Sequence, residues 1–167
     1  GNIGRQVASR VQAFGSTVQY YDPFRLPEEM EEKLHMKYVG LEELIRTSDV
    51  ITLHVPLMDS TRHMIGEKEI EKMKDGAILI NVARGGLMDD EAVVNAVNSG
   101  KLSGAGIDCV EEEPAKPGSL ILENPNIIVT PHVGGGSADI SDVMFPMITG
   151  NIELLAIGKE LKYRSEE

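Results

Sequence analysis

The sequence of 167 residues is poor in cysteine and in basic residues. Its one cysteine, Cys109, excludes an internal disulfide framework and fits a reducing compartment, so we predict a cytoplasmic location. Lysine and arginine number 16 against 27 acidic residues, and the net charge of −11 argues against a nucleic-acid partner, because phosphate binding needs clustered cations. No apolar run is long enough to span a bilayer, which argues against a membrane partner.

Two kinds of catalytic site are absent from the sequence pattern as well. Cysteine, histidine and acidic residues show no spacing typical of metal ligands, so we expect no metal site. There is no G-x-S-x-G sequence of the kind that carries a nucleophilic serine. Cys109 falls within a predicted strand, where a buried and inert thiol is favoured over a reactive one. The length suits one domain with an ordinary core.

Strand-like and helix-like segments alternate along the chain. Apolar residues at three- and four-residue spacing predict a helix over residues 4–14, which Gly15 ends. Further strands are predicted over 16–21, 49–55, 77–82, 104–108 and 127–130, and further helices over 41–47, 65–73, 91–98 and 137–156. Pro146 lies inside the last helix and predicts a kink or a split there. Alternation with short connections predicts an α/β fold with a doubly wound parallel sheet.

The chain begins with Gly1-Asn2-Ile3-Gly4, which is similar to the second half of a G-x-G-x-x-G phosphate-binding loop. Alone, this pattern indicates no more than a helix that starts with glycine. A predicted helix and strand follow, however, and Asp22 ends that strand 18 residues after Gly4. A carboxylate there can bind the adenosine ribose and repel a 2′-phosphate, which favours NAD over NADP. Taken by itself Asp22 would be a turn residue, and the nearby Arg25 weakens the NAD preference.

Three charged residues, Arg84, Glu113 and His132, each lie beyond a predicted strand. Ligands of open α/β sheets bind outside the carboxyl ends of the strands, so the three side chains can converge on one site. Arginine binds carboxylates, imidazole exchanges protons near neutral pH, and a carboxylate orients the imidazole. A surface arginine and a loop histidine remain open alternatives. The pattern does not separate Glu113 from Glu111 or Glu112.

Five segments, residues 1–5, 53–57, 81–86, 106–114 and 130–135, occur in this order. Together they resemble the cofactor-binding domain of the D-isomer-specific 2-hydroxyacid dehydrogenases, and the resemblance covers nearly the whole chain. It implies that Arg84 binds the substrate, that Glu113 is the acidic partner, and that His132 is the acid–base. The cofactor-binding residues it implies are Gly1, Asn2, Ile3, Gly4, Asp22, Val55, Val82, Ala83, Asp108 and Gly134.

The resemblance implies an NAD-dependent oxidoreductase that transfers a hydride between NAD(H) and a small anionic D-2-hydroxy or 2-oxo acid. Relatives dimerise largely through this domain, which implies a homodimer. An alternative from another class is an NAD(H)-sensing regulatory or corepressor-like protein that binds the cofactor without turnover. The joint presence of Arg84, Glu113 and His132 favours the enzyme, because a sensor needs only the cofactor contacts.

Family members insert this domain into a separate substrate domain. We therefore expect residues 1–158 to form a dinucleotide-binding domain of the Rossmann type that lacks its first strand. Residues 159–167 are expected to be a C-terminal tail, and the substrate domain is expected to be absent. Without that domain the chain by itself is expected to be inactive.

Overall fold

The computed structural model describes residues 1–162 of the chain. These residues belong to two compact units, Gly1–His132 and Val133–Glu167. Residues 163–167, part of the predicted C-terminal tail, lie outside the described residues. Within the described part of the chain, no helix is both long enough and apolar enough to cross a membrane.

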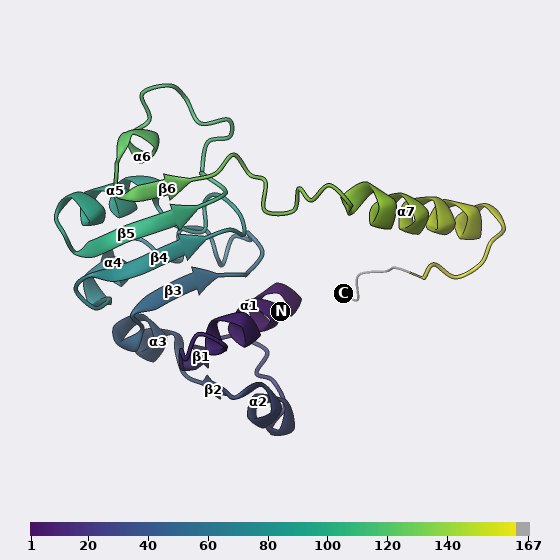
Figure 1. The fold of residues 1–167 in the computed structure, drawn as a ribbon, viewed down its shortest axis with the longest axis horizontal. Coiled ribbons are helices and arrows are strands. Elements are labelled where there is room, and N and C mark those ends of the chain that lie inside the picture. Colours follow the sequence, from purple (N-terminus) through teal and green to yellow (C-terminus); the bar gives the residue numbers. More distant parts are fainter. Residues whose placement is uncertain (163–167) are drawn as a thin grey trace. The chain divides into compact units, whose positions relative to one another are not determined.

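The first unit consists of parallel strands joined by helices (Figure 1). Its elements in chain order are α1 (Asn2–Gln12), β1 (Val18–Tyr20), α2 (Glu28–Leu34), β2 (Met36–Tyr38), α3 (Leu41–Thr47), β3 (Val50–Leu53), α4 (Glu67–Lys72), β4 (Ala77–Asn81), α5 (Asp90–Asn98), β5 (Leu102–Ile107), α6 (Leu120–Glu123) and β6 (Ile127–Val129). This alternation confirms the predicted α/β class.

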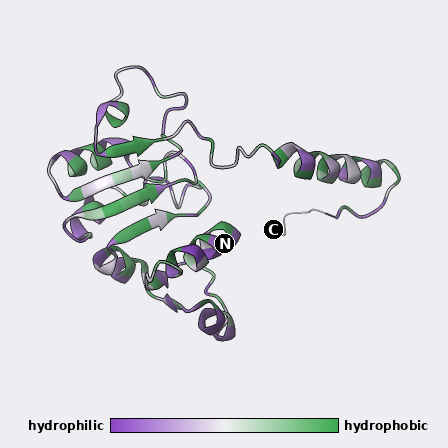
Figure 2. Ribbon diagram, viewed as in Figure 1, coloured by the Kyte–Doolittle hydropathy of each residue, from purple (hydrophilic) through white to green (hydrophobic). Residues whose placement is uncertain are grey.

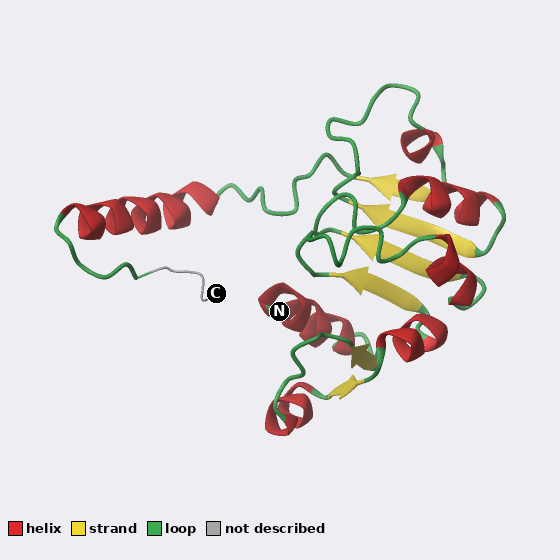
Figure 3. Cartoon of the chain, turned by 180° about the vertical axis from the view of Figure 1, so that it is seen from behind, coloured by secondary structure: helices red, strands yellow, loops and turns green. Residues whose placement is uncertain are grey.

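Within residues 1–162 the strands form two parallel sheets, β1-β2 and β3-β4-β5-β6. Figure 3 shows the strands of the larger sheet side by side and pointing the same way. The carboxyl ends of β4, β5 and β6 therefore share one edge of this sheet. The segments that carry Arg84, Glu113 and His132 begin at that edge, as the strand pattern predicted.

The core lies between the larger sheet and its helices. Leu79 of β4 and Val93 of α5 are fully buried, and Leu102 of β5 is 1% exposed. In Figure 2, β4 and β6 are drawn mostly in the green of hydrophobic residues, whereas β5 is paler. Burial of one such side chain stabilises the fold by about 1.5–3 kcal/mol. Helix α5 begins where predicted, because the side chain of Asp89 accepts a hydrogen bond from the backbone N–H of Ala92.

The break between the two sheets falls between β1 and β3 in the strand order. Helix α1 starts beside the end of β3, since a Cβ atom on Gly4 would lie 3.5 Å from Cβ of His54. The glycine-containing start of α1 thus lies near the residues that follow β1 and β3.

Some elements differ from those predicted. Strand β2 and helix α6 were not predicted, because three and four residues are too few to show a periodic pattern. Helix α7 (Ile140–Ala156), in the second unit, runs unbroken through Pro146, so the predicted split is wrong. No described residue of α7 is buried, and water can hydrate the carbonyl that proline leaves without its helical donor.

Candidate active site

A buried asparagine shapes the turn that carries Arg84. Asn81 ends β4 and is fully buried. Its Nδ2 donates to the carbonyl of Arg84 at 2.9 Å, and its Oδ1 accepts from the backbone N–H of Ala83 at 3.2 Å. Because the amide is satisfied on both sides, it fixes the backbone of the turn. Sequence reasoning gave Asn81 no role, although an amide in an apolar strand was a visible signal.

The side chain of Arg84 is exposed at this edge of the sheet. Its Nη1 donates to the carbonyl of Ala83 at 2.7 Å. This bond uses one of the five N–H donors of a guanidinium, so others remain to bind an anion. The cation also lies close enough to Cys109 to act electrostatically on the thiol.

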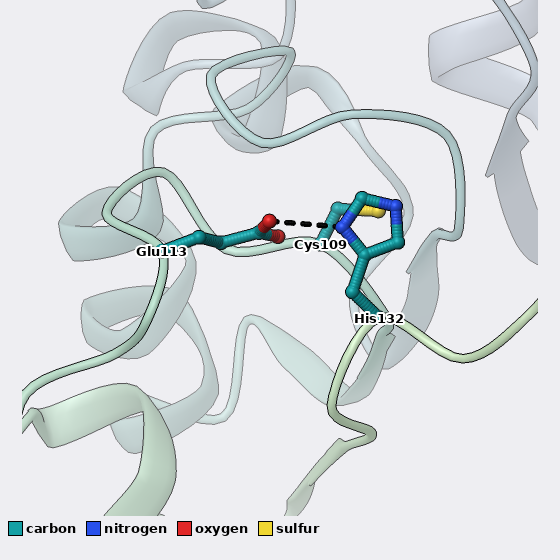
Figure 4. A group of neighbouring side chains, drawn as sticks. All are labelled: Cys109, Glu113 and His132. Atoms are coloured by element: carbon teal, nitrogen blue, oxygen red, sulfur yellow. Dashed lines mark hydrogen bonds and ion pairs between the residues drawn. The ribbon is translucent and has the colours of Figure 1, made fainter.

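His132 and Glu113 form a close pair (Figure 4). His132 Nδ1 lies 2.8 Å from Glu113 Oε2, and both side chains are about half exposed. The neighbouring glutamates have other partners: Glu111 contacts His63, and Glu112 contacts Lys116. An ionised Glu113 accepts from Nδ1–H, and His132 Nε2 is then the ring atom that can exchange a proton with a ligand.

The backbone around His132 is tied to the end of β5. His132 has a φ of +52°, in the left-handed region, and its N–H donates to the carbonyl of Thr130 at 3.0 Å. The hydroxyl of Thr130 donates to Asp108, which is 4% exposed. A non-glycine residue in this conformation costs of order 1–3 kcal/mol and persists where surrounding contacts hold it. The imidazole is therefore held in a defined position.

Cys109 lies beside this pair. It is fully buried, as predicted, but it lies two residues beyond the end of β5 and not within a strand. Its Sγ lies 3.5 Å from the carbonyl oxygen of Ala83. Burial raises the pKa of the thiol, and the charges of Glu113 and Asp108 add to the rise. One ligand atom each from Cys109, Glu113 and His132 lie within 4.8 Å of one another. Spacing along the chain did not indicate this cluster of metal-ligand types, because the loop after β5 and the end of β6 bring it together.

The predicted phosphate-loop residues form the start of α1. Gly1 is the N-cap residue of the helix, and Ile3 is 68% exposed. The nitrogen of Gly1 lies 3.6 Å from Asp22 Oδ2, just beyond β1. Asp22 also stabilises a turn, because its Oδ1 accepts from the N–H of Phe24 at 2.9 Å. Asp22 is thus both a turn residue and a neighbour of the helix start.

Arg25, which was expected to weaken the NAD preference, is bound to another carboxylate. Arg25 Nε and Nη2 donate to the two carboxylate oxygens of Glu31 at 2.8 and 2.9 Å, and its guanidinium lies over the ring of Tyr38. Glu31 is 8% exposed, so this ion pair is partly shielded from solvent. Hydrogen bonds from Arg25 and Tyr20 lower the pKa of Glu31 to about 2.

The other predicted cofactor-binding residues differ in their surroundings. Val55 and Ala83 are partly buried and pack against the core, whereas Val82 is 44% exposed. Asp108 is buried at the end of β5. Gly134 belongs to the second unit and is not placed relative to the others. The first unit therefore brings all the predicted site residues except Gly134 into one compact body.

Comparison with known proteins extends these observations. Residues 1–134 match the family described as D-isomer specific 2-hydroxyacid dehydrogenase, NAD binding domain. A glyoxylate reductase of Korarchaeum cryptofilum is 40% identical over 152 residues, which cover 91% of this chain and 46% of the relative. A glycerate dehydrogenase of Methylorubrum extorquens is 41% identical over 161 residues, which cover 95% of this chain and 48% of the relative. The chain spans about half the length of these curated relatives.

Solved structures agree with this relationship. A glyoxylate reductase from Paecilomyes thermophila has a TM-score of 0.88 at 41% identity, covering 96% of this chain and 48% of that one. A D-lactate dehydrogenase with NAD+ from Lactobacillus jensenii has a TM-score of 0.89 at 31% identity, covering 100% of this chain and 53% of that one. The chain therefore belongs to the D-isomer specific 2-hydroxyacid dehydrogenase family and carries its NAD binding domain.

Proposed function

We propose that this chain, in the protein that carries it, transfers a hydride reversibly between NAD(H) and a small anionic D-2-hydroxy or 2-oxo acid. The observation that carries the proposal is the 2.8 Å pair of His132 and Glu113. It lies at the same sheet edge as the turn of Arg84. Cofactor binding alone does not need such a pair. Relatives named glyoxylate reductase and hydroxypyruvate reductase support the same chemistry.

The start of α1 fits the pyrophosphate of the cofactor. Gly1 and Gly4 have no side chain, so a ligand can approach the backbone closely at the start of α1. The first N–H groups of a helix lack helical partners and favour an anion. We assign the ribose hydroxyls to Asp22, and the 3.6 Å between its Oδ2 and the nitrogen of Gly1 supports this assignment. Bound there, the cofactor would supply or accept the hydride.

The side chains then divide the remaining work. The guanidinium of Arg84 binds the substrate carboxylate and polarises the neighbouring carbonyl. During reduction His132 gives its Nε2 proton to the carbonyl oxygen as the carbonyl carbon gains the hydride, and in oxidation it takes that proton back. Glu113 accepts from Nδ1–H, which orients the ring and leaves Nε2 facing the substrate oxygen in this proposal.

We also infer a homodimer that works in the cytoplasm and binds neither nucleic acid nor membranes. The free, buried thiol of Cys109 and the net charge of −11 support this environment and the lack of a nucleic-acid partner. Apolar side chains exposed on α7, such as Ile152 and Leu155, support association with a second copy. The competing NAD(H) sensor would bind the cofactor and have no use for the His132–Glu113 pair.

Steady-state oxidation of NADH with glyoxylate, hydroxypyruvate, pyruvate and phosphohydroxypyruvate tests the proposal in the protein that carries this chain. His132→Ala should lower kcat by about 10²–10⁴-fold and leave NADH binding intact. His63→Ala is the matched control, because His63 forms a similar pair with Glu111. Unchanged turnover in His132→Ala would remove His132 from the mechanism. NADH binding without oxidation by any of the four acids would support the sensor.

A further inference from the structure

Cys109, Glu113 and His132 offer a set of metal ligands that the proposed hydride transfer does not explain. The proposed reaction uses the imidazole and the carboxylate, and it has no use for a thiol. Yet the thiol sulfur, a carboxylate oxygen and a ring nitrogen lie within 4.8 Å of one another. Figure 4 shows the sulfur beside the imidazole, on the side chain that comes from the end of β5.

This spacing is close to that of a tetrahedral zinc site. Zinc–sulfur bonds are about 2.3 Å and zinc–nitrogen or zinc–oxygen bonds about 2.0–2.2 Å, so bound ligand atoms lie roughly 3.3–3.8 Å apart. The 2.8 Å between His132 Nδ1 and Glu113 Oε2 is shorter than this range, and the 4.8 Å limit of the cluster is longer, so an ion would require side-chain rotations that open the first distance and shorten those to the sulfur. Thiolate, imidazole and carboxylate together suit a thiophilic divalent ion better than magnesium or calcium, which prefer oxygen alone. Water can take the fourth position.

The residues around Cys109 supply negative charge, and two of them connect the sulfur with solvent. Glu113 and the buried Asp108 contribute negative charge near the sulfur, against the positive charge of Arg84. Cys109 is fully buried, but the side chains of His132 and Glu113 are 45% and 38% exposed. An ion can therefore enter from solvent through the exposed pair and reach the sulfur behind it. The thiol proton would pass to solvent as the sulfur binds.

A second histidine–glutamate pair shows what the cysteine adds. His63 Nε2 lies 2.8 Å from Glu111 Oε1, and these side chains are 41% and 40% exposed. In type, distance and exposure this pair matches His132 and Glu113. Among residues 1–162, however, only the His132 pair joins a cysteine in a cluster of three ligand types. The chain thus contains its own control for the role of the sulfur.

We propose that Cys109, Glu113 and His132 bind a thiophilic divalent cation such as Zn²⁺, and that the bound ion withdraws His132 from proton transfer. Ion and proton transfer compete for the same imidazole, so metal binding would switch the site off. Metal binding itself stands on the cluster geometry alone, whereas the inhibition rests on the proposed function.

Titration of the chain with Co²⁺ in a phosphine reductant tests the binding. Because Cys109 is the only cysteine, a sulfur-to-cobalt charge-transfer band in the near ultraviolet reports this site alone. The many carboxylates can bind cobalt without producing that band. We expect the band to saturate at one equivalent of Co²⁺ and to disappear when Zn²⁺ is added.

Variants assign the ligands. Cys109→Ser and Cys109→Ala should abolish the band, and circular dichroism would show whether each is folded. His132→Gln should weaken Co²⁺ binding by about tenfold or more, since the loss of a group that merely supports a ligand already costs about 10–100-fold. His63→Gln should leave the binding unchanged. Absence of the band at stoichiometric Co²⁺, or equal binding by His132→Gln and the unmodified chain, would overturn the metal site.

Inhibition is measured separately, in the active protein that carries this chain. Zn²⁺ should inhibit NADH oxidation. The inhibition constant for Zn²⁺ should be about tenfold or more higher in Cys109→Ala than in the unmodified protein. Each constant is taken from rates divided by the rate of the same protein without zinc. Zinc inhibition that is the same in Cys109→Ala would overturn the switch. A protein with the cobalt band and no activity would instead contradict the proposed function and leave the metal site established.

Discussion

A methyl group on Gly85 would lie 1.9 Å from the carbonyl oxygen of Val110. Gly85 follows Arg84 directly, and Val110 lies three residues before Glu113. The turn after β4 and the segment after β5 are therefore in backbone contact. Backbone atoms yield less than the ends of flexible side chains, so this contact sets the spacing between the arginine and the carboxylate of the candidate active site.

Gly85→Ala should lower both stability and activity. The methyl group must push the two backbone segments apart, and overpacking of this kind costs about 1–3 kcal/mol. For a chain of this length that lowers Tm by roughly 2–4 °C for each kcal/mol, which thermal unfolding followed by circular dichroism would show. Gly40→Ala is the control, because a Cβ atom there meets nothing within 4 Å. Equal Tm values for the two variants would mean that the contact is loose.

The ionised carboxylate of Glu31 should stabilise the folded state, and this stabilisation should be lost in acid. Hydrogen bonds from Arg25 and Tyr20 lower its pKa from 4.5 to about 2. The native state therefore favours the ionised form of this carboxyl group more than the unfolded state does. The contribution is complete above about pH 4.5 and is lost as the pH falls toward 2. The difference in urea midpoint between the unmodified chain and Glu31→Gln should therefore shrink across this range. Glu43→Gln, which removes an exposed pair with Lys37, should have a smaller effect. A difference that is constant with pH would contradict this account.

Asp90 should have the opposite effect on the pH dependence of stability. Burial raises its pKa, and the charges of Glu111 and Asp89 add to the rise. One oxygen accepts from the N–H of Glu111, but no donor within residues 1–162 contacts Oδ1. Since the native state binds this proton more strongly, stability falls as the pH rises from the usual value of 3.8 through the raised pKa.

Asp90→Asn should therefore gain stability relative to the unmodified chain between pH 4 and pH 7. Urea unfolding at the two pH values measures the change. Asp89→Asn keeps a residue that can cap α5 and should show a weaker trend. If the stability of both variants relative to the unmodified chain changes equally with pH, then ionisation of Asp90 does not destabilise the folded state more than ionisation of Asp89 does.

Strands such as β4 could be predicted because a short apolar run that contains β-branched residues and follows a glycine favours a buried strand. The three-residue strand β2 offers no such run. Side-chain partners in loops were less predictable. Glu111, Glu112 and Glu113 are adjacent in sequence, yet each contacts different side chains, because tertiary structure decides the direction of each. Resemblance to a family selected Glu113, whereas spacing alone did not.

Arg25 shows the same limit in the cofactor-binding region. Its closeness to Asp22 in sequence suggested a free cation for a 2′-phosphate. The buried carboxylate of Glu31 instead binds the guanidinium through two hydrogen bonds. That contact depends on α2 folding back against β1 and β2, which short-range sequence pattern does not show.

Cofactor choice should follow from this arrangement. With a complete phosphate-binding loop ahead of Gly1, NAD(H) should bind more tightly than NADP(H), because Asp22 bonds the ribose hydroxyls and repels a 2′-phosphate. Hydrogen bonds to a charged group are worth about 1.5–3 kcal/mol, which corresponds to roughly ten- to a hundredfold in affinity. Titration of both cofactors by nicotinamide fluorescence measures the ratio. Equal affinities in the unmodified protein would mean that Asp22 acts only in its turn.

Substitution of Asp22 separates the two charged residues. Asp22→Ser should reduce the ratio of NAD(H) affinity to NADP(H) affinity, mainly because NAD(H) binds less tightly. NADP(H) affinity should increase little, since Glu31 still binds Arg25. When Asp22→Ser is combined with Glu31→Gln, the charged hydrogen bonds between Arg25 and residue 31 are weakened. Arg25 can then reach a 2′-phosphate, so this double variant should bind NADP(H) more tightly than Asp22→Ser does. Glu31→Gln alone controls for any loss of stability at α2. If Asp22→Ser by itself gains NADP(H) affinity as fully as the double variant, then Arg25 leaves Glu31 readily and the pair seen here does not control cofactor choice.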